Sequence, residues 1–236
     1  MTDDVVSAVD GVIAARRSIR AFLPRPVPPD IVADILDVAA RAPSGVNTQP
    51  WKVHVLTGAA LASLSLAIVT EFDNPESAGK HVAEFNTYPD KWMAPYVERR
   101  RKVGWDLYGL LGITKGDARR MHAQVRRNYE FFGAPVGLIF VVDRVMAQGS
   151  MLDYGMFMQN VMLAAKARGL DTCPQAAFAP YHQVIRAELQ LPPEQMVMCG
   201  MALGHADHDA IENTLQTVRE PASTFAVFHD HAPSTP

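Results

Sequence analysis

The spacing of apolar and polar residues along the chain predicts mainly helices. Residues 5–15 carry apolar side chains at three- and four-residue intervals, and the same spacing resumes after Pro29 at the end of a proline-rich link. Further helices are expected at residues 58–72, 96–111, 117–132 and 181–189. Helices therefore dominate the predicted structure.

Three segments have the patterns of strands. Residues 51–57 alternate between apolar and polar positions, which is typical of a half-buried strand. Residues 136–142 and 196–203 are continuous apolar runs, as expected of strands buried on both faces. Because these strands are few and lie far apart among helices, the predicted fold is one α+β domain spanning residues 1–236.

The longest predicted helix, residues 149–168, is apolar on nearly every side. A helix without a polar face is buried in a core or against a partner subunit.

Two segments are expected to extend from this domain. Residues 74–95 combine four turn-forming prolines and glycines with polar residues; together with the helix after them they predict a mobile excursion at about 74–110. From about residue 205 to 236 the chain is polar and irregular, which predicts a C-terminal arm. Aromatic residues of the excursion are candidates for a wall over a planar substrate, although core packing would also explain them: Tyr88, Trp92, Tyr96, Trp105 and Tyr108.

Residues 42–51 form the loop around which the site is expected to be built. Proline and glycine end the helical pattern before it, and a strand begins at its end. Its small polar residues offer many hydrogen-bond donors and acceptors in little space, which suits the edge of a flat polar ligand. A structural turn is the alternative interpretation.

A cationic cluster lies near the N-terminus. Arg16, Arg17 and Arg20, with the hydroxyl of Ser18, match the oxygens of a phosphate group, and Arg219 in the arm is a candidate to complete the cluster. The alternative is a solvated helix end favoured by the helix dipole. The more basic run at residues 98–102 is expected to be a solvated helix face.

Composition narrows the classes of function. The chain has 236 residues, 48% hydrophobic and 20% charged, with a net charge of −3, which gives no reason to expect nucleic acid or a membrane surface as a partner. Neither a spanning helix nor a signal peptide is expected, and two distant cysteines suit a reduced, cytoplasmic protein. No metal site is expected from the histidines, and Cys173 is interpreted as a packed small side chain rather than a reactive thiol.

Four motifs in this order resemble the FMN-dependent nitroreductase family: residues 16–20 (Arg-Arg-Ser-Ile-Arg), residues 42–51, residues 174–178 (Pro-Gln-Ala-Ala-Phe) and Arg219. Each motif alone is weak, but the four together are specific and span nearly the whole chain. Residues 103–108 and 131–135 are similar to the nitrobenzoate-reductase-like branch of that family.

The resemblance implies a nitroreductase-like fold with a central, mostly antiparallel sheet flanked by helices. It also implies an intertwined homodimer with two FMN sites at the interface. The residues that it implies in FMN binding are Arg16, Arg17, Ser18, Arg20, Pro43, Ser44, Gly45, Asn47, Pro174, Gln175, Ala176, Ala177 and Arg219.

The resemblance also implies individual roles. Arg16, Ser18 and Arg219 would hold the FMN phosphate, and Arg20 would lie at the N1/O2 edge of the ring, where its charge stabilises the reduced flavin. The loop residues Pro43, Ser44, Gly45 and Asn47 would come from the other subunit. Backbone groups around Ala176 and Ala177 would donate to flavin N5. Some relatives carry Glu-Gly at these two positions, so this chain keeps the backbone role but has no carboxylate there.

The expected activity is reduction of nitroaromatic compounds with NADH or NADPH, by ping-pong hydride transfer through flavin N5 and with no side chain as the catalytic group. Two alternatives stay open. One is another flavin reductase of the same fold, acting on quinones, enones, free flavin or halogenated compounds. The other is a non-catalytic flavin-binding protein.

Overall fold

The computed structural model describes residues 3–146 and 148–229. Its centre is a four-stranded sheet in the order β1-β2-β4-β3, with every neighbouring pair antiparallel. The strands are β1 (Lys52–Thr57), β2 (Val136–Asp143), β3 (Asp171–Gln175) and β4 (Gln195–Gly204). The expected antiparallel sheet is therefore confirmed.

The two inner strands hold the core. Seven of the eight residues of β2 are buried, because helices cover the sheet on both sides. Leu138 and Phe140 pack into the cluster on one face, and Ile139 packs into the cluster on the other. This explains why the sequence of β2 is continuously apolar.

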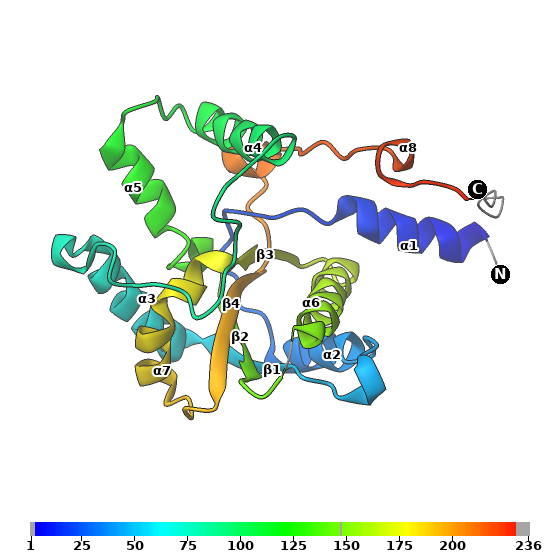
Figure 1. Ribbon diagram of the computed structural model, residues 1–236, viewed down its shortest axis with the longest axis horizontal. Helices are drawn as coiled ribbons and strands as arrows, with labels where there is room; N and C mark the ends of the chain where they lie inside the picture. The colour runs from blue at the N-terminus through cyan, green and yellow to red at the C-terminus, as the bar shows by residue number, and fades with distance from the viewer. Residues whose placement is uncertain (1–2, 147, 230–236) are drawn as a thin grey trace, which may run out of the picture.

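Each face of the sheet has its own helices. On one face, α2 (Pro29–Ala39) and α6 (Gly149–Ala167) pack over β2 and β4. On the other, α3 (Gly58–Asp73) and α7 (His182–Leu189) pack together with η4 (Ala176–Tyr181). The helices α4 (Tyr96–Leu110) and α5 (Ala118–Arg126) lie at the top in Figure 1.

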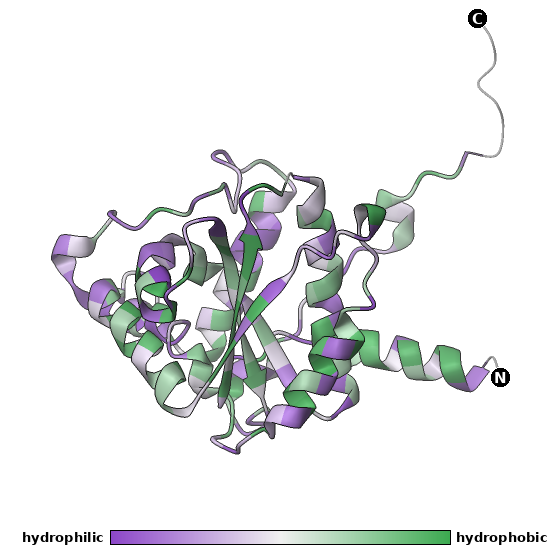
Figure 2. Cartoon of the chain, turned by 90° about the horizontal axis from the view of Figure 1, so that it is seen from below, coloured by the Kyte–Doolittle hydropathy of each residue, from purple (hydrophilic) through white to green (hydrophobic). Residues whose placement is uncertain are grey.

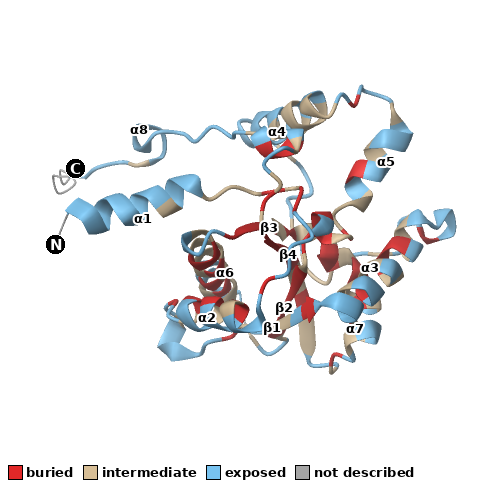
Figure 3. Ribbon diagram, turned by 180° about the vertical axis from the view of Figure 1, so that it is seen from behind, coloured by how far each residue is buried: buried red, intermediate tan, exposed pale blue. Residues whose placement is uncertain are grey.

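Two segments lie apart from this core. Every residue of α1 (Asp3–Ala15) is exposed or only partly buried, and the helix projects sideways with its apolar residues uncovered (Figures 2 and 3). The arm begins at η5 (Ile211–Thr214), whose Glu212 and Asn213 are still buried, and then runs outward through α8 (Ala222–Phe225) on the same side. Among the described residues, no helix is long and apolar enough to cross a membrane.

The apolar helix expected over residues 149–168 is α6, and it is buried along one side only. Tyr154, Phe157 and Val161 are buried against the sheet, whereas Leu152 is 74% exposed and Met156 is 40% exposed. The helix therefore packs on the core along one side and leaves an apolar face open on the other.

One predicted helix was too long, and one strand was not predicted. The helix expected over residues 117–132 ends at Arg126, because Phe131 and Phe132 adopt left-handed backbone in the turn η3 (Phe131–Gly133). The strand that was not predicted is β3, which contains Pro174 and Gln175 of the motif at residues 174–178. A short edge strand containing Pro174 has no recognisable strand pattern, and proline is tolerated at a sheet edge.

Candidate functional site

The cationic segment at the end of α1 is attached to the edge strand β3. Ser18 pairs with Thr172 in an isolated parallel bridge, and the Ile19 backbone N–H donates to the Thr172 carbonyl over 3.1 Å. Ile19 is buried at 3% exposure, so its side chain fixes the segment in the core. Two of the four sequence motifs, residues 16–20 and residues 174–178, therefore belong to one region of the structure.

Cys173 shows how closely the arginines approach β3. Burial raises the pKa of its thiol to about 11, although the positive charges of Arg20 and Arg16 act in the opposite direction. The side chain is only 3% exposed. A thiol that is buried and protonated at neutral pH fits the expected packed side chain.

Arg20 borders a small hollow of about 90 Å³ below α4 and α5. Its guanidinium donates to the Ser18 carbonyl over 3.2 Å. The hollow is lined by Arg20, Leu107, Tyr108, Gln124, Val125, Asn128 and Phe132. Of the five aromatic residues proposed for a substrate wall, Tyr108 is the one that lines this hollow.

Two buried oxygen atoms beside this segment have no hydrogen-bond partner within the described chain. They are Oγ1 of Thr172 and Oε1 of Gln175, whose residues are 1% and 3% exposed. The amide nitrogen of Gln175 does have a partner, the Asn128 carbonyl at 2.7 Å. Buried polar atoms are normally satisfied, so these two atoms fit a site that takes an additional polar ligand.

The next residues, Ala176 and Ala177, open η4 directly after β3. Both are partly exposed. The first turn of a helix has backbone N–H groups without intrahelical partners, and such groups can donate hydrogen bonds to an oxygen or nitrogen of a ligand. The structure thus joins Pro174, Gln175 and these two alanines in one strand-to-helix junction.

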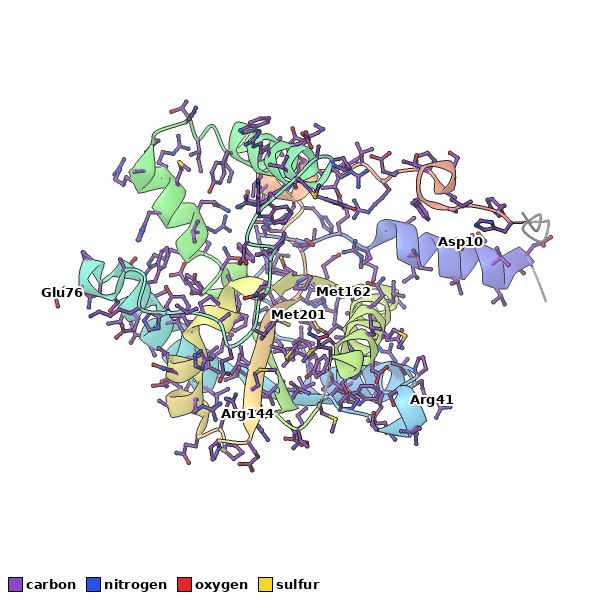
Figure 4. All side chains as sticks on the ribbon, viewed as in Figure 1. Asp10, Arg41, Glu76, Arg144, Met162 and Met201 are labelled. Atoms are coloured by element: carbon purple, nitrogen blue, oxygen red, sulfur yellow. The ribbon has the colours of Figure 1, made fainter. Side chains whose placement is uncertain are left out.

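The polar loop at residues 42–51 lies elsewhere. It contains η1 (Gly45–Asn47) and is tied to α6, because the Gly45 N–H donates to Asp153 Oδ2 over 3.1 Å and Trp51 stacks on Phe157 at 4.8 Å between ring centroids. Figure 4 labels Arg41 at the outer end of α2, far from Met201 in the sheet. Within one described chain, Pro43, Ser44, Gly45 and Asn47 are therefore not brought to the arginines.

The backbone of this loop is strained. Val46, Asn47 and Gln49 have φ angles of 45°, 60° and 48°. A left-handed conformation costs a residue with a Cβ roughly 1–2 kcal/mol, and it is rare for a β-branched residue. Val46 is also 98% exposed. Strain of this kind is concentrated at functional sites, and here it presents an apolar side chain to the outside.

The remaining candidates are scattered over the surface. Arg17 is partly buried at the end of α1, and the Arg219 guanidinium hydrogen-bonds within the arm, to Thr217 and the Val218 carbonyl. Tyr88, Tyr96 and Trp105 are between 58% and 69% exposed. The rings of Tyr88 and Trp92 lie 5.8 Å apart, and Arg100 covers Trp92 at 5.1 Å.

The first part of the predicted excursion is attached to the core. Ser77 Oγ donates to Glu71 over 2.6 Å, and His81 stacks on Tyr181 with 4.6 Å between ring centroids. Glu84 pairs with Arg144. Tyr88 and Trp92 lie beyond these attachments, and the mobility of the excursion stays a prediction.

Sequence reasoning missed the residues that hold Arg20. Asn213 and Glu212 come from η5, and Arg127 follows α5; all three contact Arg20 or one another. A single Asn or Arg has no sequence pattern that identifies such a role. The available signal was the short apolar-polar stretch 211–214 in the otherwise irregular arm.

Comparison with known proteins defines the class. Residues 13–205 match the nitroreductase family, and the chain belongs to that family.

Among its relatives, a 4-nitrobenzoate reductase of Pseudomonas putida is 42% identical over 97% of this chain and 96% of its own length. A nitrobenzene nitroreductase of Ectopseudomonas oleovorans is 41% identical over 93% of this chain and 96% of its own length. The crystal structure of the FMN and NADPH-dependent nitroreductase NfnB from Sphigopyxis sp. strain HMH superposes with a TM-score of 0.90 and 37% identity, over 94% of this chain and 99% of that one.

Proposed function

We propose that this protein is an FMN-dependent NAD(P)H oxidoreductase that reduces nitroaromatic compounds. The observation that carries the proposal is the attachment of Ser18 and Ile19 to Thr172 of β3, which brings Arg16 and Arg20 close enough to act on Cys173. Two buried oxygens of the same strand have no hydrogen-bond partner among the described residues. The relatives that are named as nitroreductases at about 40% identity support the reaction class.

The donor set of this region fits FMN. Arg16 and Ser18 would hold the phosphate, with Arg17 adjacent and Arg219 closing in from the arm, because guanidinium forks match phosphate oxygens. Arg20 would face the N1/O2 edge of the ring. The backbone at Ala176 and Ala177 would donate to the N5 edge. Thr172 Oγ1 and Gln175 Oε1 have no partner among the described residues, so both can accept hydrogen bonds from a ligand.

When bound, FMN would supply hydride transfer between a nicotinamide and a nitro compound, with donor and acceptor using the site in turn. The residues of the chain would orient the flavin and the substrate and would polarise the flavin ring. The positive charge of Arg20 would stabilise negative charge at the pyrimidine edge. Pro174 and Gln175 would set the position of the η4 turn, and Tyr108 would lie where a flat aromatic substrate stacks.

The second half of the site would come from a partner subunit. We infer a homodimer in which Pro43, Ser44, Gly45 and Asn47 of one chain complete the site of the other. Three features support this: the loop lies away from β3, Val46 is 98% exposed, and an open hollow of about 500 Å³ lies between Pro43 and the uncovered face of α6. Large uncovered apolar surfaces mark association sites.

Anaerobic stopped-flow absorbance tests the proposal. The FMN-loaded protein is mixed with NADH or NADPH while loss of the flavin colour is followed, and 4-nitrobenzoate is then added. Fast bleaching followed by fast return of colour is the expected result. Bleaching without return would keep a reductase and indicate quinones, enones or halogenated aromatics as acceptors. A protein that binds FMN but is not bleached by either nucleotide would be a flavin-binding protein, and the proposed activity would be wrong.

A further inference from the structure

The backbone of Arg20 is held on both sides by residues outside the four motifs. Its N–H donates to Asn213 Oδ1 over 2.7 Å, and its carbonyl accepts from the Arg127 guanidinium over 2.9 Å. The two partners come from η5 and from the turn after α5, so neither is near Arg20 in sequence. We call Asn213, Arg127 and Glu212 the Arg20 clamp.

Each member of the clamp is itself fixed. The amide nitrogen of Asn213 donates to the Ala21 and Asp207 carbonyls, both over 2.8 Å, so both its amide atoms are used. The other arm of the Arg127 guanidinium pairs with Glu212, whose side chain is 9% exposed. Arg127 also lies over the Phe132 ring at 6.0 Å.

Burying the charged Arg127–Glu212 pair costs desolvation free energy, which suggests that the pair has a role other than stability. An ion pair with one nearly buried carboxylate adds little stability over apolar packing, whereas it holds its partners in one geometry. Here that geometry includes the main chain of Arg20. With its main chain held at both ends, Arg20 carries its guanidinium from a fixed backbone position to the small hollow that it borders.

We infer that Arg127 and Asn213 are positioning residues, and that the Arg20 clamp sets the position of the Arg20 charge at the flavin edge and thereby tunes the reduction potential of bound FMN. This inference rests on the proposed function, because it requires FMN beside Arg20. Preorganised charge is more effective than charge that must be oriented during the reaction.

The variant Arg127→Lys separates positioning from folding. Lysine keeps a positive charge for Glu212 but lacks the planar fork, so it cannot bond Glu212 and the Arg20 carbonyl together. The matched control is Arg126→Lys. The neighbouring Arg126 pairs with Asp73 and Glu130 on the surface and makes no contact with Arg20 in the described structure.

The experiment measures the midpoint potential of bound FMN by spectroelectrochemistry and the FMN dissociation constant of the apoprotein by fluorescence quenching. In R127K we expect a more negative potential and a dissociation constant raised about fivefold, the equivalent of roughly 1 kcal/mol for one hydrogen bond. R126K should match the wild type in both.

A double-mutant cycle identifies the route of the effect. If Arg127 acts through Arg20, the potential of R20A/R127K equals that of R20A, because the clamp has no charge left to position. A wild-type potential in R127K, or shifts of R20A and R127K that add, would overturn the inference while leaving the proposed function intact. A wild-type protein that binds no FMN would overturn both.

Should R127K fail to fold, Glu212→Gln tests the same clamp. Glutamine keeps the volume and a hydrogen-bond acceptor but removes the charge that holds Arg127. We expect a smaller shift of the potential in the same direction. An unchanged potential in folded, FMN-loaded E212Q would count against the clamp.

Discussion

The side chains at the proposed cofactor site differ in how firmly the structure holds them. Arg20 is fixed by backbone bonds on both sides, whereas the Arg219 guanidinium bonds only to its neighbours in the exposed arm within the described chain. A residue of the first kind supplies a charge of fixed direction. A residue of the second kind is free to close on a ligand after the ligand arrives.

Arg219→Ala tests the second kind of contribution. Loss of a guanidinium from a phosphate removes hydrogen bonds to a charged group, worth about 1.5–3 kcal/mol, and should weaken FMN binding roughly 10- to 150-fold. The measurement is flavin retained per chain after gel filtration. Arg119→Ala, at another exposed arginine, is the control and should retain flavin. Full flavin content in R219A would remove Arg219 from the phosphate site.

Cys173→Ser should leave turnover within about twofold of the wild type, because a thiol whose pKa is raised to about 11 by burial is not an effective nucleophile at neutral pH. The measurement is the steady-state rate with NADPH and 4-nitrobenzoate. Complete loss of turnover in a folded, FMN-loaded C173S would reveal a catalytic thiol.

His54 on β1 should make the stability depend on pH. Burial lowers its pKa from the usual 6.5, and a hydrogen bond with Gln195 opposes this in part. The unfolded chain therefore binds the proton more readily than the native one, so stability is complete above pH 6.5 and falls as the pH drops below it. When melting temperatures are measured at pH 8, 7, 6 and 5, they should fall less steeply with decreasing pH in His54→Gln than in the wild type. His205, whose pKa is also lowered by burial, contributes to the slope that remains. An identical slope in both proteins would exclude His54.

At the scale of elements, β4 and η4 are packed together through a glycine. A Cβ added at Gly200 would lie 2.4 Å from Cδ2 of Phe178, a side chain with no exposed surface. This close approach seats η4, and with it Ala176 and Ala177, on the central strand. The position of the turn that would face flavin N5 thus depends on residue 200 being glycine, which has no Cβ.

Gly200→Ala should therefore destabilise the protein. Overpacking a well-filled core costs typically 1–3 kcal/mol, which lowers the melting temperature by roughly 2–10 °C for a chain of this size. The matched control is Gly104→Ala in α4, where the added Cβ meets nothing within 4 Å. The control should be neutral or slightly stabilising, since alanine is the better helix former. Equal melting temperatures for the two variants would contradict the packing argument.

The sequence predictions were accurate where an element is determined by its own residues and inaccurate where it depends on contacts with distant residues. β2 was predictable because helices bury both its faces and every position must be apolar. β3 was not, because five residues with Pro174 form a strand only by pairing with β4, which follows in the sequence. The helix over residues 117–132 was overextended because Phe131 and Phe132 have apolar side chains at helical spacing, and tertiary packing turns their backbone left-handed.

The candidate site was predictable as far as its residues lie in short motifs. The sequence placed Arg16, Arg20, Gln175 and the alanines in one family pattern, and the fold brings those segments together. It did not reveal Asn213, because its bond to Arg20 joins residues 193 positions apart. The roles of these residues in FMN binding stay predictions.

At the scale of the molecule, the uncovered apolar surface is concentrated on one side. It comprises α1, the outer face of α6 and the arm, with exposed residues that include Val6, Ile13, Leu152, Phe225 and Phe228. Figure 3 shows α1 and α8 exposed along nearly their whole length, whereas β2 is buried in all but one residue. In the proposed homodimer, a second copy of the chain covers this surface and brings its loop at residues 42–51 to the site.

The protein should therefore sediment at about twice its chain mass of 25.9 kDa. Leu152→Glu, which places a charge in the middle of the α6 face, should shift it towards the monomer and release FMN. Leu66→Glu is the control: this leucine on α3 is 68% exposed, compared with 74% for Leu152, but it lies outside the proposed interface. A wild-type protein that sediments as an FMN-loaded monomer would disprove the shared site.

The bonds between residues 18–23 and residues 205–213 also determine when the chain can finish folding. Phe22 bridges to Ala206, Leu23 donates to the His205 carbonyl, and Asp207 donates to the Ala21 carbonyl. During synthesis the first of these segments leaves the ribosome long before the second exists, and contacts so distant in sequence form slowly. The nascent chain therefore spends most of its synthesis with its N-terminal segment unpaired and its apolar strands uncovered. The bonds that hold residues 21–23 in place can therefore form only near the end of synthesis.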